Sequence, residues 1–301
     1  MNKINLDSST SKCFYDEQSV NASTLDTESR NAIASRFSAA ATHYQDFDVL
    51  QRMSARRLLK HFCPRGRVLD IGAGPGTVFN QSSCPHLCTH VSPALQVVAL
   101  DIAQGMLQHL QTQFPDYRAV AGDAQQLPFQ DASFHSLYSN VALQWCHDFS
   151  RAVSEAGRVL KNGGEFHLAV VAKGSLAELC ELGFAVNAFN DEKVLSGSFH
   201  PESWDILSSQ CEPLTVYFDD LKSLLYSIKG VGASIQTPKI VSTHGAMNNQ
   251  DAAPMPSLTL RGRKDWQALM ERADTMRTQK GLPLTYQIMF IRARKKQVLG
   301  S

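Results

Sequence analysis

The sequence contains no apolar run that approaches the roughly 18 residues needed for a membrane-spanning helix. No apolar stretch follows the first lysines, so we expect neither a secretory signal nor a membrane anchor. An excess of either charge is also missing, because 29 basic residues balance 28 acidic ones to a net charge of +1. Such a chain has no global field that would recruit nucleic acid, and an anionic partner would need a local basic patch.

Paired cysteine spacing is absent as well. Seven scattered cysteines, an odd number, are typical of reduced thiols in a cytoplasmic protein rather than of a disulfide framework. Cys84, Cys88 and His90 have a zinc-like spacing, but no second ligand pair follows at finger-like distance, so we expect no metal site. The apolar fraction of 43% is nevertheless sufficient for a sizeable core.

Three regions differ in pattern. Residues 1–29 are polar and have few apolar side chains, which predicts a flexible tail. Residues 30–62 carry apolar side chains at three- and four-residue steps, which predicts one or two helices with a basic opposite face. Strand and helix patterns alternate over residues 63–296 and predict an α/β domain with a parallel sheet covered on both faces. Within this domain, residues 237–256 are polar and predict a mobile loop insert.

The individual elements follow from local periodicity. After a buried first strand, the expected strands are 96–101, 118–123, 135–139, 165–172, 214–218 and 284–291. The expected helices are 102–113, 150–160, 201–209, 223–231 and 266–278, with another that begins at residue 174. Residues 161–164 contain two glycines and read as the C-cap of the helix before them.

The stretch from Val68 to Gly76 is the centre of this pattern. Glycines 72, 74 and 76 stand at alternate positions where a buried strand passes into a turn, so backbone can approach a ligand there. Thr77 occupies the place of the third glycine of the dinucleotide fingerprint, and the six-residue NAD pattern is therefore not met. A tight turn without any ligand is the alternative interpretation.

Asp101 ends the second strand. A carboxylate at this position can accept both hydroxyls of a ribose, which favours an adenosine-containing ligand without identifying it. The same side chain could also cap the following helix, and the two roles are compatible.

Two stretches resemble class I S-adenosylmethionine (SAM) methyltransferases: Val68–Gly76 is similar to their motif I, and Gly122–Phe134 to the sequence after their third strand. The resemblance implies a Rossmann-like fold with a seven-stranded, mostly parallel sheet, SAM as cofactor and S-adenosylhomocysteine (SAH) as product. It also implies that the glycine turn and Asp70 hold the amino-acid end of SAM, while Asp123 and Ala124 meet the adenine. The implied cofactor-binding residues are Gln51, Asp70, Gly72, Gly74, Gly76, Asp101, Ile102, Asp123, Ala124 and Asn140.

A narrower resemblance covers about residues 30–294. Segments 36–44, 139–146, 174–179, 227–233 and 283–286 look like the malonyl-acyl-carrier-protein O-methyltransferases of biotin synthesis. This implies that the free carboxylate of a malonyl group on an acyl carrier protein becomes a methyl ester, under an N-terminal helical lid. The tail, an insertion before Asp101 and the 237–256 loop depart from the family pattern.

Such a carboxylate is ionised at neutral pH, so methyl transfer needs orientation and exclusion of water rather than a base. Tyr44 and Gln51 could close the lid, although core packing is the alternative for both. Gln144 and Trp145 follow the fourth strand and could line the acyl pocket. Lys229 and Lys173 are candidates to orient the carboxylate, and each reads equally well as a surface lysine.

Two other functions fit the same motifs. One is methylation of a quinone precursor at carbon, for which His147 is the nearest candidate base, or of a small free carboxylate. The other is a non-catalytic SAM-binding module. An acidic carrier protein would require a basic rim, for which there are two candidate patches: Arg52, Arg56, Arg57 and Lys60, or Arg151, Arg158 and Lys161.

Overall fold

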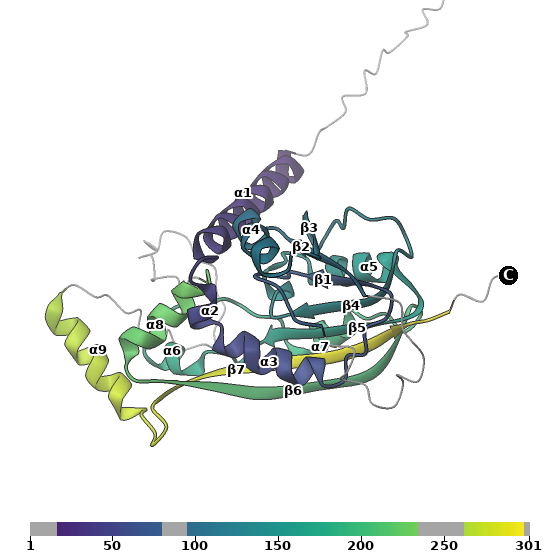
Figure 1. The fold of residues 1–301 in the computed structure, drawn as a ribbon. Helices are drawn as coiled ribbons and strands as arrows, with labels where there is room; N and C mark the ends of the chain where they lie inside the picture. The colour runs from purple at the N-terminus through teal and green to yellow at the C-terminus, as the bar shows by residue number, and fades with distance from the viewer. Residues whose placement is uncertain (1–16, 80–94, 234–261, 298–301) are drawn as a thin grey trace, which may run out of the picture.

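The computed structural model describes residues 17–79, 95–233 and 262–297 (Figure 1). The cysteine and histidine group at 84–90 and the predicted 237–256 loop lie outside these ranges, as do residues 1–16 of the predicted tail. None of the helices formed by the described residues is long and apolar enough to cross a membrane.

The described residues form one seven-stranded sheet in the order β3-β2-β1-β4-β5-β7-β6, which confirms the predicted mostly parallel sheet. Only β7 runs antiparallel to its neighbours, β5 and β6. The strands are β1 (Arg67–Ile71), β2 (Gln96–Asp101), β3 (Arg118–Ala121), β4 (Phe134–Asn140), β5 (Leu160–Ala172), β6 (Trp204–Phe218) and β7 (Leu282–Lys295).

Helices cover both faces of this sheet (Figure 1). They are α1 (Glu17–Ala40), α2 (Tyr44–Phe47), α3 (Val49–Leu59), α4 (Gln104–Gln113), α5 (Phe149–Val159), α6 (Ala177–Glu181), α7 (Glu192–Gly197), α8 (Leu221–Gly230) and α9 (Arg263–Thr275). A short 3₁₀ turn, η2 (Leu143–Trp145), follows β4.

Alternation along the strands builds two cores. Leu69 faces the side covered by α5, and Val68, the residue before it, faces the side covered by α3. Helix α5 buries Phe149 and Val153 in the first core, whereas α3 buries Leu58 in the second. Each such side chain contributes roughly 1.5–3 kcal/mol on burial. The two cores fix β1, β2 and β4 side by side, so that their carboxyl ends form one edge.

Helix α1 packs beside α4 above this edge (Figure 1). The Gly105 amide of α4 donates to the Ser38 hydroxyl over 3.1 Å, and Ala41 joins Ala103 and Met106 in a small apolar cluster. Helix α1 begins at Glu17, so residues 17–29 of the predicted tail are helical in the structure. Backbone hydrogen bonds propagate a helix from its anchored half even where few apolar residues are present.

Two further expectations fail at the ends of strands. Residues 201–209 were expected to be helical, yet most of them belong to β6, which pairs with β7 along its length. A short apolar run does not show whether its periodicity is that of a helix or of a strand. Pairing with a long neighbouring strand decides between the two structures. Residues 161–164 belong to β5 and do not cap the preceding helix. The pairing of β5 with β4 is irregular there, because Phe134 pairs with Leu160 and Ser136 with Glu165, and Gly163 has φ +77°.

The cysteines also differ in part from the expectation. Cys146, Cys180 and Cys211 are free thiols, whereas Cys63 is disulfide-bonded. Sequence spacing does not reveal such a bond, because it depends on which residues the fold brings within bonding distance.

Candidate functional site

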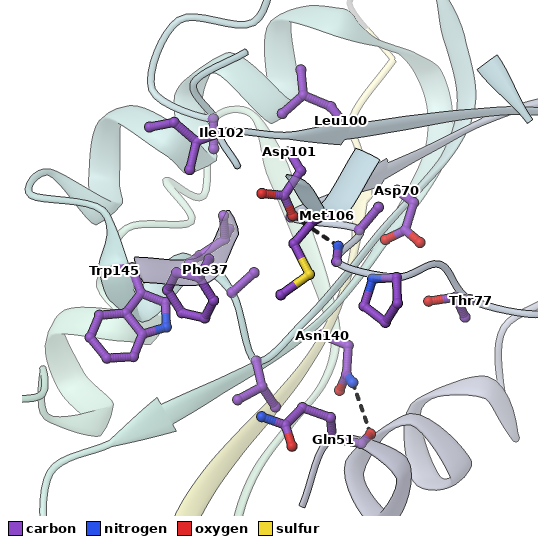
Figure 2. A pocket seen from close by; sticks show the side chains of 18 of the residues that line it. Phe37, Gln51, Asp70, Thr77, Leu100, Asp101, Ile102, Met106, Asn140 and Trp145 are labelled. Carbon is purple, nitrogen blue, oxygen red and sulfur yellow. Dashed lines mark hydrogen bonds between the residues drawn. The ribbon is translucent and has the colours of Figure 1, made fainter. Parts of the chain in front are cut away.

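A cavity of about 310 Å³ opens at the carboxyl ends of β1, β2 and β4. Ligands of open α/β sheets bind at this edge. All the predicted cofactor-binding residues line the cavity, and Figure 2 shows Asp70 and Asp101 there on neighbouring strands. The structure thus brings together residues from α3, from β1, β2 and β4, and from the segments that follow β1, β2 and β3.

The glycine turn lines part of this cavity. Gly72, Gly74 and Gly76 have φ values of +70°, +55° and +104°, a region in which other residues are strained. A Cβ on Gly72 would lie 2.3 Å from the Cβ of Ala142, whereas a Cβ on Gly74 would meet nothing within 4 Å. Gly72 therefore serves close packing between β1 and the exit of β4, and Gly74 leaves the backbone open to a ligand.

Asp101 connects the turn to α4. Its Oδ2 accepts the Gly74 amide and its Oδ1 the Ala103 amide, each over 2.8 Å (Figure 2 shows the first). Burial raises the pKa of the carboxyl, and these backbone hydrogen bonds act in the opposite direction. Each carboxylate oxygen retains a further lone pair, so the side chain can hold the turn and still accept hydroxyls from a ligand.

Asp70 is only 1% exposed, and its Oδ2 has no hydrogen-bond partner. Burial raises the pKa of this carboxyl to about 7, with a smaller contribution from the charge of Asp101 and an opposing hydrogen bond from Thr77. Tyr138, the register partner of Asp70 on β4, also has a buried hydroxyl without a partner. A buried acid of this kind favours a cation or a hydrogen-bond donor in the cavity.

Asp123, after β3, is bonded from two sides. Arg30 of α1 pairs with its Oδ2 over 2.8 Å, and the Gln125 amide donates to its Oδ1 over 2.8 Å. Burial would raise the pKa of this carboxyl, but the hydrogen bonds from Gln125 and Arg30 outweigh it and lower the pKa. The Arg30 contact was missed from the sequence, because Arg30 lies 93 residues from Asp123 at the predicted border of the tail.

Asn140 connects β4 to α3. Its Nδ2 donates to the Gln51 carbonyl over 3.0 Å, and its Oδ1 accepts the Ser54 hydroxyl over 2.7 Å (Figure 2 shows the first). The amide of Asn140 is thus largely used within the protein, although the residue lines the cavity. The side-chain Oε1 of Gln51 is buried without a partner.

A second cavity of about 260 Å³ adjoins the first. Its lining is mainly apolar, and it shares five residues with the first cavity: Phe37, Tyr44, Gln51, Val141 and Trp145. The rings of Phe37 and Trp145 meet edge to face, 5.5 Å apart (Figure 2). Val141 has φ +52°, which is rare for a β-branched residue and marks the backbone between the cavities as constrained.

Comparisons with known proteins identify the family. A model described as a methyltransferase domain matches residues 69–168. A malonyl-[acyl-carrier protein] O-methyltransferase of Herminiimonas arsenicoxydans is 33% identical and covers 89% of this chain and 97% of its own. One from Pseudescherichia vulneris is 34% identical and covers 68% of this chain and 80% of its own. The chain belongs to the malonyl-[acyl-carrier protein] O-methyltransferase family.

Solved structures agree on the fold of this methyltransferase. A candidate methyltransferase of Bacillus halodurans matches with a TM-score of 0.53 at 17% identity, covering 81% of this chain and 100% of its own. A chain from the Haloferax volcanii complex with the Trm112 methyltransferase activator has a TM-score of 0.52 at 16% identity, covering 89% and 100%. At such low identity the likeness shows the fold alone.

The protein is a SAM-dependent methyltransferase. The first cavity fits this cofactor, because SAM is a cation that carries an adenosine. The buried Asp70 oxygen without a partner suits a positive group, and Gly74 leaves room for close backbone approach. The spare lone pairs of Asp101 suit hydroxyl groups.

The lysine candidates do not reach either cavity. Lys229 and Lys173 are exposed, and neither lines a cavity formed by the described residues, so the prediction that Lys229 acts in catalysis is not supported by its position. The period of α8 explains this, because the same helix turns Ser227 and Ile228 toward the second cavity. By contrast, Tyr44, Gln144 and Trp145 all line it.

Both predicted basic patches are partly neutralised. Arg52 pairs with Asp48, and Arg57 pairs with Glu212 of β6. In the second patch, Arg158 binds two carboxylates and the carbonyls of Leu127 and Phe129. These arginines form pairs within the protein, although Arg52 and Arg57 are themselves exposed, and Arg56 and Lys60 are also exposed on α3 and just after it.

Proposed function

We propose that this methyltransferase transfers the methyl group of SAM to the free carboxylate of a malonyl group carried by an acyl carrier protein. The main observation in support is the pair of adjoining cavities, one acidic and one mainly apolar, that share Tyr44, Gln51 and Trp145. The names of the relatives supply the substrate class. Exposed Arg56 and Lys60 could meet an acidic carrier protein.

The proposed roles of the cofactor residues come from the family resemblance, and their positions in the first cavity support these roles. Asp70 attracts the cationic amino-acid end, Gly72, Gly74 and Gly76 allow backbone contact, and Asp101 accepts ribose hydroxyls. Ile102 and Ala124 border the adenosine, Asp123 accepts from its adenine, and Asn140 with Gln51 holds α3 against the strand end.

The chemistry requires positioning and a dry site. Bound SAM supplies the electrophilic methyl group. The malonyl carboxylate is already ionised at neutral pH and needs no general base. Phe37 and Trp145 exclude water at the junction of the cavities, and Tyr44 stays protonated because burial, with the charges of Asp101 and Asp48, raises its pKa. Tyr44 is therefore a hydrogen-bond donor at neutral pH.

SAM affinity should depend on pH through Asp70. Its pKa is raised to about 7, so the ionised form that attracts a cation accumulates as the pH rises through that value. We expect affinity to increase from about pH 6 to about pH 8, with proton release on binding at the lower pH. Calorimetry at several pH values measures both. The Asp70→Asn variant should lose this part of the dependence, and a flat wild-type profile would argue against the role of Asp70.

The experiment that tests the proposed function identifies the bond formed. The protein is incubated with methyl-labelled SAM and malonyl-acyl-carrier protein, and the product is treated with mild alkali. A methyl ester releases the label as methanol, whereas a methyl group on carbon is retained. A base-stable label would support the carbon-methylating alternative. That alternative needs a base, and His147 is exposed and outside both cavities, which have no histidine among their described lining residues.

A further inference from the structure

The second cavity raises the question of what holds the substrate carboxylate. No lysine, arginine or histidine is found among the described residues that line it. The one charged side chain there is Asp46, which is 70% exposed and lies 3.7 Å from His43. The cavity wall formed by the described chain therefore offers a carboxylate only neutral hydrogen-bond donors.

The side chains with neutral donors on this wall are those of Tyr44, Gln51, Gln144, Trp145, Asn187, Ser223, Ser227 and Tyr286, and some of these donors are already used. The hydroxyls of Ser223 and Ser227 donate to carbonyls of their own helix region, over 2.8 and 2.7 Å. Gln144 Nε2 donates to the Val141 carbonyl over 3.0 Å, which leaves one of its hydrogens. The hydroxyl of Tyr286 and the side chain of Asn187 make no hydrogen bond with another described residue, and both line the cavity.

Tyr286 is the better placed of these two. It lies on β7 within the sheet, where residue 286 pairs with Leu214 of β6, and its ring packs against both neighbouring apolar cores. Asn187 lies in the irregular segment after α6. Burial and the charge of Glu178 raise the pKa of Tyr286, so its phenol is a donor throughout the neutral range.

We infer that the hydroxyls of Tyr286 and Tyr44 together bind and orient the substrate carboxylate for methyl transfer, an inference that rests on the proposed function. Tyr44 lines both cavities and so borders the proposed SAM site, whereas Tyr286 lines the second cavity alone. The two phenols can therefore bind the carboxylate from the cofactor side and from the acyl side.

Neutral donors suit this reaction better than a cation. A carboxylate oxygen uses a lone pair to form the new bond to carbon while the carbon–sulfur bond breaks, and that electron pair goes to sulfur. No proton moves. A lysine ammonium would form an ion pair with the carboxylate and lower the nucleophilicity of its oxygen. Neutral phenols bind the carboxylate and lower this nucleophilicity less. The product ester is neutral and accepts weaker hydrogen bonds, so the same donors favour its release.

The test compares Tyr286→Phe with the wild type and with Tyr226→Phe, which removes a hydroxyl from an exposed tyrosine on α8. Two quantities are measured: kcat/KM with malonyl-acyl-carrier protein, and the affinity for malonyl-pantetheine relative to its methyl ester in the presence of SAH. We expect Tyr286→Phe to lower kcat/KM by about 10- to 100-fold and to reduce the preference for the acid by a similar factor. SAH affinity should not change, and Tyr226→Phe should match the wild type.

Several results would overturn the inference. A Tyr286→Phe variant that keeps the wild-type preference for acid over ester would show that this hydroxyl does not bind the carboxylate. Equal losses for acid and ester would assign Tyr286 to the shape of the cavity. Loss of the preference in Asn187→Ala instead would transfer the role to Asn187. Failure of the proposed function is distinct, because the wild type itself would then form no base-labile methyl product.

Discussion

Replacing Asp101 with alanine is expected to weaken SAH binding by on the order of 1.5 to 3 kcal/mol, or roughly 10- to 150-fold. The variant loses the acceptor proposed for the ribose hydroxyls. It also frees the Gly74 and Ala103 amides, which each donate to this carboxylate over 2.8 Å. The turn would then be less well ordered before the cofactor binds. Calorimetry with SAH measures the loss.

A matched control keeps this result specific. Asp116 is an exposed carboxylate shortly before β3 and outside both cavities, so Asp116→Ala changes the net charge equally and should bind SAH as the wild type does. Unchanged affinity in a folded Asp101→Ala variant would place the ribose elsewhere. A loss of the same size in both variants would indicate a general effect of charge.

The second large effect is expected at the glycine turn, where substitutions at two alternate glycines should separate folding from cofactor binding. Gly72→Ala combines φ +70° with a Cβ 2.3 Å from that of Ala142, and should lower the free energy of unfolding by roughly 2 to 4 kcal/mol. Gly74→Ala has a similar φ but no clash, so about 1 to 2 kcal/mol is expected. Chemical denaturation of the protein without cofactor measures both.

The affinity for SAH should distinguish the two glycine variants in a different way from their stability. The added methyl at position 74 borders the cavity and should weaken SAH binding even though the variant stays folded. Equal destabilisation by both substitutions would mean that backbone strain alone matters and that the contact with Ala142 relaxes. Wild-type SAH affinity in Gly74→Ala would contradict close backbone approach of the cofactor at this glycine.

Local signals in the sequence were sufficient for the central fold. Three signals could each be recognised within a few residues. They are a strand that ends in alternating glycines, an acid at the end of the next strand and a polar residue after the expected fourth strand. Parallel strands place their carboxyl ends at one edge, so these side chains had to gather there. Every predicted cofactor-binding residue accordingly lines the first cavity, although their binding roles stay predictions.

Pairing and side-chain orientation were decided by the tertiary structure. Residues 204–218 became one strand because β7 supplied a partner along its length, which no local period could indicate. Lys229 points away from the cavity because the phase of α8 depends on what its apolar face packs against. Arg30 meets Asp123 only because α1 packs on α4, and Tyr286 lines the second cavity only because β7 lies between β5 and β6. Sequence alone determined the turn chemistry and the strand ends, which are short-range properties of the backbone. The partners of each side chain depend on contacts between residues far apart in the chain, and only the folded structure fixes those.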